Sequence, residues 1–146
     1  MISKLNTITL LDVNLLHLAK TIYGEARGEN IETMFTVGWV IRNRLQSGKH
    51  GKTYKDVVLQ PKQFSCWNKG DPNYKRIKGT IKGRLWEVCI GVAIVVMQLS
   101  ERHNPISGVR HYYDKSLDSN PPYWAEGGEY IAVYGVNNLR LIKGIK

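Results

Sequence analysis

Hydrophobic residues recur at helical spacing in three stretches of the chain. These stretches predict helices over residues 12–27, 30–48 and 81–99, of which the last is the most apolar. Asp12 and Asn30 are suited to cap the first two helices. The buried faces would be formed by Leu15, Leu18, Ala19 and Ile22, then by Met34, Val37, Gly38, Ile41 and Leu45, and then by Ile81, Leu85, Val88, Cys89, Val92, Val96 and Leu99.

The periodicity is lost between the second and third helices. Gly48 is expected to end the second helix. Residues 47–80 are then rich in Gly, Lys, Pro and aromatic residues. A short helical turn is expected over residues 54–59, where Pro61 would stop it.

Glycines and prolines divide the chain into short pieces after Glu101. Residues 110–113 and 130–134 have the alternation of short strands. The sequence therefore predicts a mainly helical α+β fold, with a small β element near the C-terminus. No repeat or linker divides the chain, so residues 1–146 are expected to form a single domain.

Composition adds size and charge to this picture. The chain has 146 residues, 42% of them hydrophobic, which is the balance of a folded globular protein. A domain of this length can bury a core without metal or disulfides. Its net charge of +9 points to a polyanion or an anionic surface as partner. The densest basic stretch is Lys69–Arg84, where Asp71 is the one acidic residue.

Several classes of protein are not expected from this sequence. Residues 2–20 lack the pattern of a secretory signal, and the apolar run Val88–Leu99 is too short to span a membrane. Cys66 and Cys89 lack metal-ligand spacing, so no metal or other cofactor is expected. A disulfide between them would require an oxidising compartment.

Glu25 is the first candidate for chemistry. It is predicted at the last turn of the first helix, where the helix dipole and partial burial would both raise the pKa of its carboxyl. A carboxyl that keeps its proton near neutral pH can act as a general acid. The alternative is a solvated Glu25 paired with Arg27. Glu29 is expected to stabilise the start of the next helix instead of acting as a second catalytic carboxylate.

Aromatic residues in the loops suggest a binding surface. They stand beside amide and hydroxyl side chains, a mixture that suits flat ligands such as sugar rings or bases. The alternative is that half of them cover the helices. His111 is a lone histidine for which a structural hydrogen bond is the usual role. The aromatic residues are Phe64, Trp67, Tyr74, Tyr112, Tyr113, Tyr123 and Trp124.

Three blocks of sequence resemble the SleB-type cell-wall hydrolases, the spore-cortex-lytic enzyme family that phages also use. The first is LAKTIYGEARGE at residues 18–29, followed by VIRNR at residues 40–44. The second is LQPKQFSCWN at residues 59–68, and the third is VRHYYDKSLDSNPPYWA at residues 109–125. Their order and spacing resemble those of the family over nearly the whole chain.

The resemblance implies a lysozyme-like domain that cleaves peptidoglycan glycan strands at the β-1,4 bond between N-acetylmuramic acid and N-acetylglucosamine. Glu25 would be the catalytic acid and base of a lytic transglycosylation, which needs no second carboxylate. Trp67 would either stack on a sugar or cap the core, and Asn43 and Arg44 would tie the second helix to the site. The implied substrate-binding residues are Gln63, Phe64, Ser65, Trp67, Tyr112, Tyr113 and Trp124.

The chain departs from the family near its end. The family's closing strand carries a Gly-Asn-His-x-Phe pattern, whereas residues 134–139 read YGVNNL and contain no histidine. Separate peptidoglycan-binding repeats often accompany the catalytic domain in this family. We expect none within these 146 residues, because a second domain does not fit.

Two further interpretations stay open. One is a muramidase that uses water, and the other is a non-catalytic basic module that binds wall glycan or nucleic acid. For the enzyme we expect glycan strands as partner, no nucleic acid, no stable membrane insertion and a monomer. The missing signal suggests cytoplasmic synthesis, with access to the wall as a phage endolysin or by virion delivery.

Overall fold

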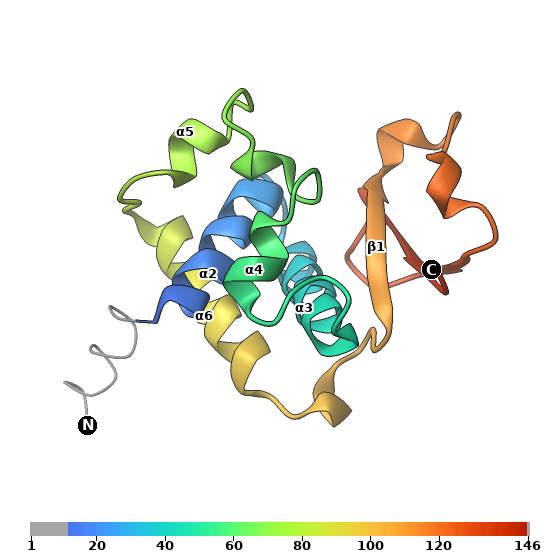
Figure 1. Cartoon of the computed structure of the whole chain (residues 1–146), viewed down its shortest axis with the longest axis horizontal. Helices are drawn as coiled ribbons and strands as arrows, with labels where there is room; N and C mark the ends of the chain where they lie inside the picture. The colour runs from blue at the N-terminus through green and yellow to red at the C-terminus, as the bar shows by residue number, and fades with distance from the viewer. Residues whose placement is uncertain (1–11, 146) are drawn as a thin grey trace.

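The computed structural model describes residues 12–145, and it shows a group of helices beside a small sheet (Figure 1). Residues 1–11 and 146, which include part of the segment considered for a signal, lie outside the described part. The mainly helical α+β class is confirmed. The helices are α2 (Val13–Ala26), α3 (Ile31–Ser47), α4 (Tyr54–Leu59), α5 (Tyr74–Ile77) and α6 (Arg84–Gln98). Single 3-10 turns are η1 (Ser65–Trp67), η2 (Glu101–His103), η3 (Lys115–Leu117) and η4 (Tyr123–Ala125).

The ends of the helices follow from local sequence signals. The Asp12 carboxylate accepts hydrogen bonds from the backbone N–H groups of Asn14 and Leu15, and the Asn30 side chain accepts one from the N–H of Thr33. Gly48 ends α3 in the left-handed conformation. These predicted caps are therefore confirmed.

The third predicted helix is shorter than its periodicity suggested. Apolar spacing begins at Ile81, but α6 begins at Arg84 because Gly83, with φ 106°, lies outside the helical region. The predicted helical turn at Tyr54–Leu59 is confirmed as α4, which the Thr53 hydroxyl caps through the N–H of Asp56.

Helix α2 packs against α3, α4, α5 and α6, so its buried face forms the centre of the core (Figure 1). Leu18 and Ile22 of this helix are fully buried. Helix α3 reaches α6 closely at Gly38, where an added Cβ would lie 2.9 Å from the Val96 side chain. Most of the hydrophobic residues assigned to the core from their periodicity are buried there.

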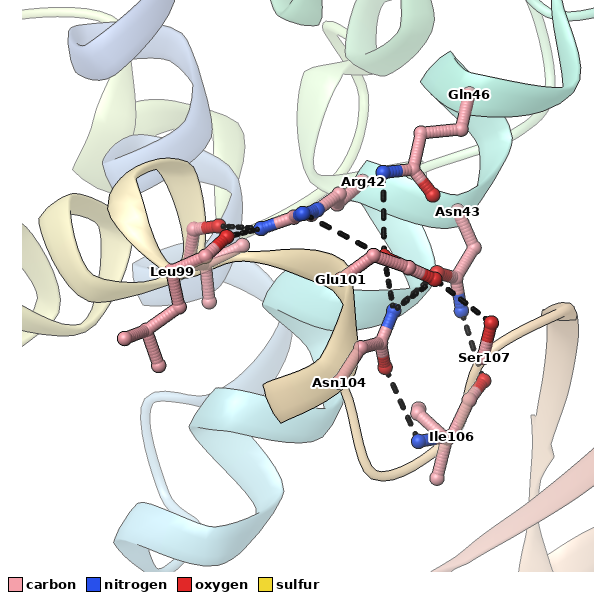
Figure 2. Close-up of polar contacts among 9 residues, drawn as sticks. Arg42, Asn43, Gln46, Leu99, Glu101, Asn104, Ile106 and Ser107 are labelled. Carbon is pink, nitrogen blue, oxygen red and sulfur yellow. Dashed lines mark hydrogen bonds and ion pairs between the residues drawn. The ribbon is translucent and has the colours of Figure 1, made fainter.

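A polar network joins the C-terminal half of α3 to the segment that leads into the sheet (Figure 2). The buried Asn43 amide donates to the carbonyls of Ile106 and Val109 at 2.9 and 2.8 Å and accepts from Asn104 at 2.7 Å. Arg42 donates to the carbonyls at the end of α6 and pairs with Glu101 at 3.4 Å. The network therefore fixes where the first strand begins relative to α3.

The sheet is antiparallel, with strand order β1-β3-β2. The strands are β1 (Val109–Asp114), β2 (Glu129–Ile131) and β3 (Leu139–Lys143). The first predicted strand is confirmed. The second ends at Ile131 instead of Tyr134, because the chain turns and the N–H of Val136 bonds to the carbonyl of Val133. The closing strand lies at Leu139–Lys143, so it begins only at the last residue of the YGVNNL stretch in which the resemblance placed it.

The cysteines and the lengths of the helices bear on the remaining sequence predictions. Cys66 and Cys89 are both buried free thiols. Among residues 12–145, no helix combines the length and apolar character that crossing a membrane requires.

Candidate active site

Glu25 lies in the last turn of α2, beside the 3-10 turn η1. The preceding Gly24 permits this approach, because a Cβ at that position would lie 2.7 Å from the Cβ of Cys66. From the sheet side, the hydroxyl of Tyr112 on β1 donates a hydrogen bond to Oε1 of Glu25 at 3.0 Å. The candidate site is therefore formed where α2, η1 and β1 meet.

The surroundings of Glu25 favour its protonated form. Burial raises the pKa of the carboxyl above its ordinary value, and the negative charge of Asp71 raises it further. Interactions with Tyr112 and Cys66 act in the opposite direction on this pKa, and burial is the largest effect. A carboxyl with a raised pKa can donate a proton near neutral pH, as a general acid must.

The alternative role for Glu25, a surface ion pair with Arg27, is not seen. Within the described residues no ion pair joins these two side chains. The guanidinium of Arg27 instead lies over the ring of Tyr23, with Cζ 5.9 Å from the ring centroid. The Glu25 carboxyl is thus without a cationic partner in direct contact.

Arg44 supports this site from α3. Its Nε donates to the carbonyl of Arg110 at 2.7 Å, and its Nη1 donates to Oε1 of Gln63 at 3.1 Å. The guanidinium lies over the ring of Phe64, with Cζ 4.8 Å from the centroid. Burial lowers the pKa of Arg44, while Tyr112 and Glu25 counteract this effect. Arg44 therefore ties three segments together and places a positive charge near the Glu25 carboxyl.

A cleft of about 400 Å³ opens beside this group. Tyr112, which holds Glu25, forms part of its wall, so the carboxyl and the cleft meet at this tyrosine. The wall combines aromatic, amide and cationic groups, a combination that suits a sugar polymer with anionic substituents. The lining residues are Arg44, Lys62, Gln63, His111, Tyr112, Tyr123 and Trp124.

The structure brings together three of the predicted binding residues: Gln63, Tyr112 and Trp124 line the cleft. Phe64 is buried, with 2% of its surface exposed, and its ring packs against the guanidinium of Arg44. Ser65 is exposed at the beginning of η1.

Two predicted residues lie elsewhere. The indole of Trp67 donates to the hydroxyl of Thr21 at 2.9 Å and stacks on His17, so it covers α2. Tyr113 points to the other side of β1 from Tyr112, because side chains alternate along a strand. Its hydroxyl lies 2.8 Å from that of Tyr130, above a second small hydrophobic cluster.

The cleft also includes residues outside the predicted substrate-binding set. Tyr123 is 90% exposed at the rim, next to Trp124. It is one of the loop aromatics from which the sequence predicts a binding surface. The place of Lys62 and His111 in the cleft could not be predicted, because it depends on how β1 and the loop after α4 meet.

The Glu29 carboxylate contacts a different residue from the one that the Glu25 carboxyl contacts. Both of its carboxylate oxygens accept hydrogen bonds from the amide of Asn138, at 3.0 and 2.8 Å. This contact ties the corner between α2 and α3 to the residue before β3. Glu29 therefore helps to hold the sheet against the helices.

Comparison with known proteins identifies the family. The Cell Wall Hydrolase family model matches residues 28–138, which is more than half of the chain. The chain belongs to the Cell Wall Hydrolase family. This confirms the family resemblance seen in the three sequence blocks. The matched segment begins just after Glu25, so the role of that residue depends on the geometry described above.

A relative adds to this assignment. A protein named spore cortex-lytic enzyme, from Oceanobacillus iheyensis, is 39% identical over 62 residues, which cover 40% of this chain and 22% of that protein. The match thus spans about a fifth of the length of this curated relative. No solved structure matches the chain.

Proposed function

We propose that this cell wall hydrolase degrades peptidoglycan by cleaving the β-1,4 bond between N-acetylmuramic acid and N-acetylglucosamine, with Glu25 as both acid and base. The observation that carries the proposal is the partly buried Glu25 carboxyl, which has a raised pKa and a hydrogen bond from Tyr112 at the wall of the cleft. Membership in the family and the name of the spore cortex-lytic relative support wall glycan as the substrate.

The proposed reaction is a lytic transglycosylation. Protonated Glu25 gives its proton to the glycosidic oxygen as the bond from that oxygen to C1 of the muramyl residue breaks. The resulting Glu25 carboxylate then takes the proton of the muramyl C6 hydroxyl, whose oxygen forms a new bond to C1. The products are a 1,6-anhydromuramyl end and a free C4 hydroxyl on N-acetylglucosamine, and no water is consumed.

The residues around Glu25 suit both steps. The Tyr112 hydroxyl orients the carboxyl and stabilises its charged form after the first proton transfer. The nearby Arg44 charge favours the same carboxylate intermediate. In this mechanism one carboxyl serves both steps, so no second carboxylate is needed.

A hydrolytic muramidase is the second candidate, and Asp71 is the observation in its favour. The charge of Asp71 contributes to the raised pKa of Glu25. The Asp71 carboxylate also accepts a hydrogen bond from the N–H of Asn73 at 2.8 Å, which fixes its position. In this mechanism Asp71 would activate a water that attacks C1.

Product analysis separates the two reactions. Purified peptidoglycan is digested, and the fragments are analysed by mass spectrometry. Transglycosylation leaves anhydromuramyl ends that are one water lighter than reducing ends, and the Asp71→Asn variant should produce them at a similar rate. Reducing muramic ends, together with loss of activity in Asp71→Asn, would contradict transglycosylation and favour the hydrolase.

A further inference from the structure

A second, smaller pocket adjoins the cleft at His111. It has a volume of about 190 Å³ and is lined by Lys49, His50, Arg110, His111 and Ile145. His111 also lines the cleft, so the two hollows share a wall. The histidine rings pack edge to face, with centroids 6.3 Å apart, and His111 in turn packs against Trp124 at 5.5 Å. The pocket is thus a lateral extension of the proposed glycan site.

The pocket is strongly cationic and has no acidic residue in its lining. Neither Lys49 nor Arg110 forms an ion pair with any side chain in residues 12–145. Arg44 adds a third positive charge, because it donates to the backbone carbonyl of Arg110 and its charge acts on both histidines. Arg44 also interacts with the Glu25 carboxyl, whereas Lys49 and Arg110 converge on the pocket without an ion-pair partner in residues 12–145, and this favours an anionic ligand.

The lowered pKa values of His50 and His111 are consistent with an anionic ligand in the pocket. Burial lowers the pKa of His111 to about 4, and the charges of Arg44, His50 and Arg110 contribute to the shift. Burial also lowers the pKa of His50; the hydrogen bond to Gln60 opposes this shift, while the charges of Arg44, Arg110 and Lys49 add to it. No carboxylate is among the groups that act on either ring. The free pocket therefore keeps both rings neutral, and an anion within it would make protonation more favourable.

We propose that this pocket binds a carboxylate of the peptide stem that the muramyl residue carries. The inference rests on the proposed function, because it places a muramyl residue in the cleft. A volume of about 190 Å³ accommodates a carboxylate and the atoms next to it. The stem begins on the same sugar whose bond is cleaved, and the pocket shares His111 with the cleft, so a stem carboxylate is the anionic group nearest to the pocket when a muramyl residue occupies the cleft. Wall phosphate offers similar chemistry, and the test separates it from the stem.

The test measures binding without catalysis. Every protein carries Glu25→Gln, and binding to sacculi is measured by sedimentation. The pocket variant adds Lys49→Gln and Arg110→Gln; the side chains of these residues make no hydrogen bond in the described structure, so the fold should be kept. The control adds Arg102→Gln and Lys115→Gln, which removes the same charge from exposed positions away from the pocket.

The sacculi are used in three forms: with wall phosphate, with phosphate removed by hydrofluoric acid, and phosphate-free with the carboxyls converted to methylamides. Blocking the carboxyls should weaken binding of the parent and control proteins by about 10-fold, the scale of one charge-assisted hydrogen bond. The pocket variant should bind phosphate-free sacculi nearly equally whether their carboxyls are unmodified or converted to methylamides.

Two results would overturn the assignment. In one, the pocket variant remains as sensitive to carboxyl blocking as the control. In the other, the two additional substitutions weaken binding only when wall phosphate is present. Failure of the proposed reaction is observed separately, as a lack of cleavage products from the wild-type protein, so it cannot be confused with either result.

Discussion

The hydroxyl of Tyr112 donates a hydrogen bond to Oε1 of Glu25 at 3.0 Å, across 87 positions of sequence. This contact joins the first strand of the sheet to the last turn of α2. It places the candidate acid against the cleft wall and stabilises the charged form of the carboxyl. The effect of Tyr112 on Glu25 can therefore be tested through the pH dependence of the reaction.

Replacing Tyr112 with Phe should change the pH profile as well as the rate. The hydrogen bond lowers the pKa of Glu25, so its loss raises that pKa further. Because the first step needs protonated Glu25, the alkaline limb of the rate profile should move to higher pH. Activity at the optimum should fall about 10-fold, less than the effect of removing a general acid itself.

The measurement is the clearing of a peptidoglycan suspension across a range of pH. Tyr134→Phe provides the control, because Tyr134 is 94% exposed and does not line the cleft. An unchanged alkaline limb in Tyr112→Phe would show that this contact does not set the pKa of the catalytic group.

Glu25→Gln should make the protein more stable at neutral pH. The pKa of Glu25 is raised in the folded state, so the folded protein binds the proton more tightly than the unfolded chain. Stability is therefore lost as pH rises from the unfolded pKa through the folded pKa, and the loss persists above it. A neutral amide avoids this loss.

Thermal unfolding of the two proteins tests this prediction. The melting temperature of Glu25→Gln should exceed that of the wild type at pH 7, and the difference should disappear below the ordinary pKa of a glutamate. A variant that is less stable than the wild type at pH 7 would argue against a desolvated carboxyl.

Asn43→Ala should destabilise the fold by about 2–4 kcal/mol, because it leaves several buried polar groups without partners. The Asn43 amide serves the carbonyls of Ile106 and Val109 and the side chain of Asn104. Urea unfolding measures the loss. Asn120→Ala, at an exposed position, should change stability by less than about 0.5 kcal/mol. Equal effects of the two substitutions would rule out a structural role for the network in Figure 2.

Gly24→Ala tests the close approach of η1 to the end of α2, where Glu25 lies. An alanine Cβ would lie 2.7 Å from the Cβ of Cys66, so one of the two segments must move. We expect a loss of stability of about 1–3 kcal/mol and a larger relative loss of activity. Gly28→Ala is the matched control, since nothing lies within 4 Å of its added Cβ. Full activity in Gly24→Ala would mean that this spacing does not position Glu25.

Local features of the fold were predictable from sequence, whereas long-range contacts were not. Asp12, Asn30 and Gly48 act through the backbone within a few residues, so the boundaries of α2 and α3 follow from sequence signals. The contact of Glu29 with Asn138 depends instead on how the sheet docks on the helices. The way the sheet docks on the helices cannot be derived from the spacing of hydrophobic residues along the chain.

The same distinction applies to the candidate site. Glu25 was selected because a helix end and partial burial are local properties. Tyr112 and Tyr113 were selected together, yet alternation along β1 sends them to opposite sides of the strand. Which of the two meets Glu25 is set by the position of β1 relative to α3, and that position depends on buried contacts of Asn43.

The central claim, that Glu25 carries out the chemistry, is tested most directly by the release of soluble fragments from purified peptidoglycan by Glu25→Gln. Glu87→Gln, an identical change at an exposed position on α6, serves as the control. The proposed mechanism predicts a loss of about 100- to 10,000-fold for Glu25→Gln, with the fold retained and the control fully active. Fragment release by Glu25→Gln at the wild-type rate would contradict it.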